Sequence, residues 1–127
     1  MKPAFLEHVN VTVTDPDRTA AELEQIFGWH VRWAGESLNG GRSVHVGEEE
    51  SYIALYTHSS TVKKDRDAGQ RTNGLNHIAV VGHDLVAVEA RVIKAGFKPY
   101  SHQDYEPGKR FYFFDRDEVE YEVVSYT

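Results

Sequence analysis

Two histidines and one glutamate have the residue types and the spacing that could do chemistry in this sequence. His8 lies in the segment LEHVNV and His77 in the matching segment LNHIAV, an offset of 77 − 8 = 69 residues. Glu122 lies in the closing segment VEYEVV. Imidazoles and a carboxylate are good ligands for divalent first-row metals, and three of them leave coordination positions open for reactants. Each residue alone is more often an ordinary surface or core residue, but the repeated position of the histidines favours a metal site.

Alternation along the predicted strands places these three side chains on equivalent faces. Apolar residues at positions 9, 11 and 13 put His8 on the opposite face of the first strand, because successive side chains of a strand point to opposite sides. The same argument separates His77 from Ile78 and Val80, and Glu122 from the apolar positions 119, 121 and 123. We therefore predict that His8, His77 and Glu122 are available on the side of the sheet away from the packed core.

The repeat also predicts the architecture. Each histidine strand is followed by an acidic N-cap candidate (Asp15 or Asp84), an amphipathic helix that ends near a glycine, and three short strand patterns. Strands are expected at about 31–35, 43–47 and 52–57 in the first copy, and at 97–101, 110–114 and 119–126 in the second. The fold class is thus α+β, with two βαβββ modules forming a curved mixed sheet, as a half-barrel or barrel, and helices on its outer face. Residues 1–127 form one domain, with module one at about 4–58, an irregular linker at 59–73 and module two at 74–127.

Composition excludes several classes of function. The 127 residues include 14 Lys and Arg against 20 Asp and Glu, a formal net charge of −6, so we expect no nucleic-acid partner. Cysteine is absent, which removes disulfides, thiolate ligands and a cysteine nucleophile. No apolar run approaches the roughly 18 residues of a membrane span, and no signal sequence is evident at the start. We expect a cytoplasmic protein with a small-molecule substrate and no membrane partner, and a homodimer by default.

The duplicated plan resembles the vicinal oxygen chelate superfamily, which includes glyoxalase I, methylmalonyl-CoA epimerase, extradiol dioxygenases, fosfomycin-resistance transferases and bleomycin-resistance proteins. The resemblance rests on the openings LEHVNVTV and LNHIAVVG and on the closing segment FYFFDRDEVEYEVV, and it covers nearly the whole chain. It implies that His8, His77 and Glu122 bind a divalent metal ion, with Fe²⁺, Mn²⁺, Ni²⁺, Co²⁺ and Zn²⁺ not distinguished.

One departure from that family pattern bears on the reaction. Ala54 stands where the glyoxalases and epimerases carry a fourth ligand, Glu or Gln, so the resemblance favours ring-cleaving dioxygenase-type or transferase-type chemistry over those two activities. Lewis-acid activation of a substrate with adjacent oxygens is the shared mechanism that the family implies. Tyr56 and Tyr112 are candidates for a catalytic role beside the ligands, although packing is the commoner role of such residues.

Two alternatives remain open at this level. A metal-free, bleomycin-resistance-like binding protein would use the acidity and the aromatic residues of the chain to hold a cationic aromatic ligand. The segment Gln103–Arg110 is expected to be an exposed hairpin loop, and the competing interpretation is that it offers Lys109 or Arg110 to an anionic substrate.

Overall fold

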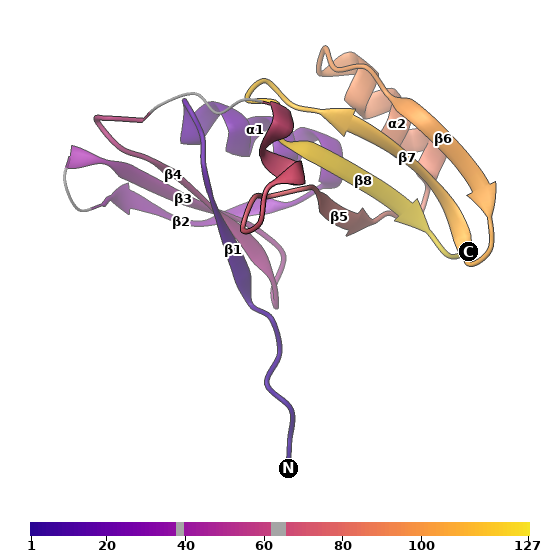
Figure 1. Cartoon of the computed structure of the whole chain (residues 1–127), viewed down its shortest axis with the longest axis horizontal. Coiled ribbons are helices and arrows are strands. Elements are labelled where there is room, and N and C mark those ends of the chain that lie inside the picture. The colour runs from indigo at the N-terminus through magenta and orange to yellow at the C-terminus, as the bar shows by residue number, and fades with distance from the viewer. Residues whose placement is uncertain (38–39, 62–65) are drawn as a thin grey trace. The chain divides into compact units, whose positions relative to one another are not determined.

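The computed structural model describes residues 1–37, 40–61 and 66–127. The chain divides into two compact units, Met1–Val62 and Lys63–Thr127, each with a four-stranded mixed sheet and one α-helix (Figure 1). Each unit has the order strand, helix, strand, strand, strand, so the predicted α+β class with two βαβββ modules is confirmed.

The first unit contains β1 (His8–Thr12), α1 (Pro16–Phe27), β2 (His30–Glu36), β3 (Arg42–Gly47) and β4 (Tyr52–Thr57), and its sheet order is β1-β4-β3-β2. β1 runs parallel to β4, and the other neighbours are antiparallel. Helix α1 begins at Asp15, whose side chain accepts from the Arg18 amide, and ends at Gly28 in the left-handed conformation. α1 packs on β3 and β4, and its apolar stripe is fully buried with the inward residues of those strands: Ala20, Leu23, Ile26, Val44, Val46 and Leu55.

The second unit repeats this arrangement. It contains the 3₁₀ helix η2 (Arg66–Gln70), β5 (Ile78–Val81), α2 (Leu85–Lys94), β6 (Tyr100–Tyr105), β7 (Gly108–Phe114) and β8 (Glu120–Ser125), with the sheet order β5-β8-β7-β6. β5 is parallel to β8, and β8–β7 and β7–β6 are antiparallel. Helix α2 lies on one face of this sheet (Figure 1). The buried core of the unit consists of Val88, Val92, Phe111, Phe113, Val119, Tyr121 and Val123.

The second half departs from the sequence prediction in two places. The strand expected at 97–101 is β6, Tyr100–Tyr105, and β7 begins at Gly108, two residues before the strand expected at 110–114, so the hairpin expected over Gln103–Arg110 turns at Glu106 and Pro107. The polar sequence of β6 hid this strand, because its side chains are mostly exposed and do not alternate clearly. The segment 59–73 was expected to be irregular; its residues 62–65 lie outside the described residues, and its described part contains η2.

None of the helices within residues 1–37, 40–61 and 66–127 combines the length of a membrane span with its apolar character.

The core of the second unit makes a stability prediction. Phe113 is fully buried and stacks on Tyr121 and Phe97, with ring centroids 5.3 and 6.0 Å away. We expect Phe113→Ala to lower the free energy of unfolding by about 3–5 kcal/mol, because it leaves a cavity among these rings. Val86→Ala is the control, since Val86 is 82% exposed on α2, and its effect should stay within about 0.5 kcal/mol. Urea denaturation measures both, and equal effects would contradict the assigned core.

Candidate functional site

Glu122 lies at the centre of the sheet face opposite to the core of the second unit. Its neighbours in the chain, Tyr121 and Val123, are buried in the core, so alternation turns Glu122 to the other side. On adjacent strands it lies beside Ala79 of β5 and Tyr112 of β7. Its side chain is nevertheless only 9% exposed, and a carboxylate buried to this extent needs compensating partners.

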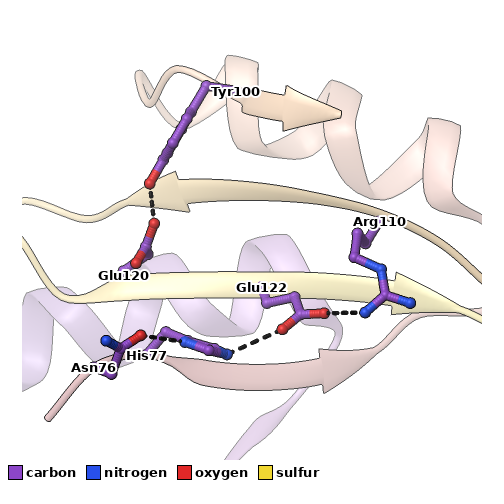
Figure 2. Close-up of polar contacts among 6 residues, drawn as sticks. All are labelled: Asn76, His77, Tyr100, Arg110, Glu120 and Glu122. Atoms are coloured by element: carbon purple, nitrogen blue, oxygen red, sulfur yellow. Dashed lines mark hydrogen bonds and ion pairs between the residues drawn. The ribbon is translucent and has the colours of Figure 1, made fainter. Parts of the chain in front are cut away.

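Two side chains flank the carboxylate, and the positive charge of one of them, Arg110, supplies that compensation. His77, immediately before β5, places Nε2 3.0 Å from Oε1 of Glu122, and Arg110 of β7 donates from Nη1 to Oε2 at 2.9 Å. Figure 2 shows the carboxylate held between the imidazole and the guanidinium. The other glutamate of this face, Glu120, accepts a hydrogen bond from the hydroxyl of Tyr100 and so has a different partner.

The second ring nitrogen of His77 also has a defined partner. Nδ1 lies 2.7 Å from Oδ1 of Asn76, which as an amide oxygen can only accept, so this contact requires a proton on Nδ1. His8 repeats the arrangement in the first unit, where its Nδ1 lies 2.9 Å from Oε1 of Glu7. An acceptor at Nδ1 selects the tautomer that leaves a lone pair on Nε2. Both histidines are therefore oriented as metal-ligating histidines usually are.

Strand register defines the counterpart of Glu122 in the first unit. Ala79 of β5 is opposite Glu122, and Asn10, 69 residues before Ala79, is opposite Ala54. Ala54 thus occupies the position of Glu122 in its own sheet and is buried, at 3% exposed. Sheet pairing supports the alignment used to identify Ala54, and this position of the first unit provides no ligand atom.

Aromatic rings and imidazoles occupy the same face of the first sheet. Tyr52 stacks against His8 and His45, with centroids 4.8 and 4.7 Å away, and the guanidinium carbon of Arg32 lies 4.5 Å from the centroid of the Tyr52 ring. Trp33 lies beside His45, at 5.1 Å between centroids. Burial is the main cause that lowers the pKa of His45 below 6.5, followed by the nearby His8 and Arg32. Within this cluster, His45 is therefore neutral at a lower pH than a fully solvated histidine would be.

Comparison with protein families decides what the chain belongs to. The model described as the Glyoxalase/Bleomycin resistance protein/Dioxygenase superfamily matches residues 5–123. The chain belongs to this superfamily. A comparison with curated proteins gave no match.

Solved structures of the superfamily have the same fold at low identity. A glyoxylase/bleomycin resistance protein/dioxygenase domain from Frankia sp. EAN1pec has a TM-score of 0.82 and 22% identity, with 99% of this chain and 100% of that chain covered. The fosfomycin resistance protein FosX from Listeria monocytogenes, complexed with Mn(II) and sulfate, has a TM-score of 0.73 and 18% identity, with 99% and 95% covered. FosX from Mesorhizobium loti has a TM-score of 0.71 and 22% identity, with 97% and 92% covered.

The predicted site residues of this superfamily member fall into two groups. His77, Glu122 and Tyr112 lie together in the second unit, where the Tyr112 ring approaches His77 edge-on at 5.9 Å between centroids. His8 and Tyr56 lie in the first unit, and Tyr56 is half-buried on β4 with its ring 6.4 Å from that of His58. Over the ranges that the structure describes, no three histidine, aspartate or glutamate side chains form a complete metal-binding group.

Sequence reasoning missed three partners of the predicted ligands. Arg110 was expected where the hairpin of residues 103–110 meets the strand of residues 110–114, with no contact to Glu122, whereas it lies within β7 and donates to Glu122. Its alternation with Tyr112, against the buried Phe111 and Phe113, is the signal that could have found it. Asn76 and Glu7 precede the two histidines at the same repeat position, so the repeat itself carried their signal.

The electrostatics of the Glu122 side of the site can be tested by titration. Burial, and then the negative charge of Glu122, raises the pKa of Tyr112 above the ordinary value of 10.0. We expect Glu122→Gln to lower the pKa of Tyr112, because it removes that negative charge. NMR of ring-labelled tyrosine measures the midpoint, with Tyr112→Phe identifying the signal. An unchanged midpoint would mean that Glu122 does not act on Tyr112.

Proposed function

We propose that this superfamily member is a divalent-metal-dependent enzyme that acts on a small substrate with adjacent oxygen atoms. The proposed ligands are His8, His77 and Glu122, with the divalent ion drawn from Fe²⁺, Mn²⁺, Ni²⁺, Co²⁺ and Zn²⁺. The observation that carries the proposal is the contact between Nε2 of His77 and Oε1 of Glu122, together with the acceptor at Nδ1 of the same ring.

The distance between these two atoms suits a shared ion. Ligand atoms at about 2.1 Å from one cation and at about 90° to each other lie about 3.0 Å apart, and the observed separation is 3.0 Å. With Nδ1 of His77 carrying its proton toward Asn76, a neutral ring has no proton on Nε2 to donate to Glu122. Two bare acceptor atoms facing each other are stabilised by a cation between them.

A second histidine–carboxylate pair shows that distance alone is not sufficient. His102 and Glu89 also approach to 3.0 Å, but the His102 side chain is 55% exposed. The His77–Glu122 pair differs in three respects: its carboxylate is buried, the other carboxylate oxygen is held by Arg110, and Asn76 sets the tautomer. These features support His77 and Glu122, rather than the surface pair, as ligands.

The third ligand that we propose is His8. Its Nδ1 contact with Glu7 matches that of His77 with Asn76, which supports an equivalent role for the two rings. A homodimer is the assembly we propose by default, and His8 then comes either from the same chain or from the second copy.

The type of reaction follows from the shape of the ligand set. A bound metal would act as a Lewis acid toward two neighbouring substrate oxygens. Because Ala54 offers no ligand and no base, three protein ligands leave room for a substrate that binds through two atoms. We propose dioxygenase-type or transferase-type chemistry on this ground, in preference to glyoxalase I or epimerase activity. FosX, described with Mn(II) and 1S,2S-dihydroxypropylphosphonic acid, supports a metal and a small oxygenated ligand. Tyr112 is positioned beside Glu122 to contact such a substrate, and Tyr56 is the corresponding proposal in the first unit.

The alternative is a metal-free, bleomycin-resistance-like binding protein. It is favoured by the cluster of Tyr52, His8, His45 and Trp33, of which Trp33 is 49% exposed. Arg32 already lies over the Tyr52 ring, however, which opposes binding of a cationic ligand on that face.

Metal titration tests the proposal. We expect the wild type to bind roughly one equivalent of Mn²⁺ or Fe²⁺ per chain under low oxygen, and His77→Ala and Glu122→Gln to lose it. Asn76→Ala should weaken metal binding by about 10–100-fold, because it removes the acceptor that holds the His77 ring in its orientation. Isothermal calorimetry and elemental analysis measure the binding, and bound iron would direct assays toward catechols and O₂.

The matched control is His102→Ala, which removes an imidazole from the exposed pair in the same unit and should leave metal binding unchanged. Thermal unfolding verifies that the variants are folded. A wild type that shows neither binding heat nor stabilisation by any of these ions would contradict the proposal and favour the binding-protein alternative.

A further inference from the structure

The guanidinium of Arg110 has one edge without a protein partner. Nη1 donates to Oε2 of Glu122 at 2.9 Å. Nε and Nη2 are both buried, and neither has a hydrogen-bond partner within residues 1–37, 40–61 and 66–127. The Arg110 side chain is only 15% exposed. Leaving buried donors of a charged group unpaired costs free energy. An acceptor from outside the chain that paired with Nε and Nη2 would remove this cost.

The two free donors form a specific recognition element. Nε–H and Nη2–H point in parallel from one side of the guanidinium, and this spacing matches the two oxygens of a carboxylate or a phosphonate. The chain contains an occupied example of the same edge. Arg42 donates from Nε to Oδ2 of Asp17 at 2.6 Å and from Nη2 to Oδ1 at 2.9 Å.

The two cross-strand neighbours of Arg110 carry no anion that could pair with this edge. They are Gln103 on β6 and Val124 on β8. The amide of Gln103 donates to Ser101, and Val124 is apolar, so neither side chain brings a negative charge. The ring of Tyr105 covers one face of the guanidinium, with its centroid 5.4 Å from the central carbon, and this ring is exposed at the surface.

We propose that Nε and Nη2 of Arg110 bind an oxyanion group of a small-molecule ligand, a carboxylate or a phosphonate. Arg110 then holds Glu122 with one nitrogen and the ligand with the other two, which places the anionic group next to the carboxylate that we propose as a metal ligand. Identifying this ligand as the substrate rests on the proposed function, whereas the binding of the anion does not.

The test is a titration followed by NMR of the arginine Nε–H groups, on the full chain freed of metal ions beforehand by passage over a chelating resin. The probes are acetate, methylphosphonate and inorganic phosphate, with acetamide as the neutral control. We expect a saturable shift of the Arg110 signal with at least one oxyanion and none with acetamide, and the strongest oxyanion identifies the chemical group. Arg110→Lys keeps the positive charge but removes the parallel donors, so it should weaken binding by about tenfold or more.

Arg42→Lys is the matched control, because the same edge of Arg42 is already filled by Asp17. It should leave oxyanion affinity at the wild-type value. An Arg110 signal unmoved by every oxyanion would mean that this edge binds no anion, and an affinity unchanged in Arg110→Lys would mean that the anion binds elsewhere. Either result overturns the proposal. Because the protein is metal-free in this experiment, its result does not depend on the metal titration, and the result of the metal titration does not depend on it.

Discussion

The second unit is organised around one constraint: a buried carboxylate, that of Glu122, lies on the sheet face opposite to the hydrophobic core. The side chain of Glu122 is only 9% exposed, so its negative charge has lost most of its hydration and requires protein partners instead. Arg110, two strand positions before Tyr112 on β7, supplies the positive charge, and His77 supplies a ring nitrogen from the entrance to β5. Each partner must itself be positioned, which explains why Asn76 fixes the ring and why the β7–β8 register matters. The packed core on the other face, around Tyr121 and Val123, holds that register in place.

The duplication shows which parts of this arrangement belong to the fold and which to the site. Both units retain the strand order, the helix caps at Asp15 and Asp84, and an acceptor placed before the first-strand histidine. They differ at the position of Glu122, which is occupied by Ala54 in the first unit. The side chains around this position therefore also differ between the two sheets. Without a carboxylate to compensate, the first sheet carries stacked rings around Tyr52 and a histidine, His45, whose pKa is lowered. The ligand count that we propose follows from this one asymmetry.

The sequence predicted much of the fold and the shared sheet face of His77 and Glu122. Repeated segments around His8 and His77 predicted two βαβββ modules, and two-residue alternation predicted that His77 and Glu122 share a face. The sequence misplaced β6, whose polar and mostly exposed side chains carry no clear periodicity, and it did not predict the contact between Arg110 and Glu122. Hydrogen-bond partners such as Asn76 depend on rotamers that no sequence pattern encodes, although their repeated position before each histidine was visible. The proposed role of His8 as third ligand remains a prediction from the repeat.

The central claim is that Nε2 of His77 and Oε1 of Glu122 are ligands of one divalent ion. Anomalous diffraction from crystals grown with Mn²⁺ tests it most directly, because the signal locates the ion independently of any assumed coordination. The account predicts a peak at about 2.0–2.3 Å from both atoms, with Nδ1 of His77 still facing Asn76. A peak at another position, or a refined structure at saturating Mn²⁺ in which the direct 3.0 Å contact persists with no ion beside it, would contradict the account.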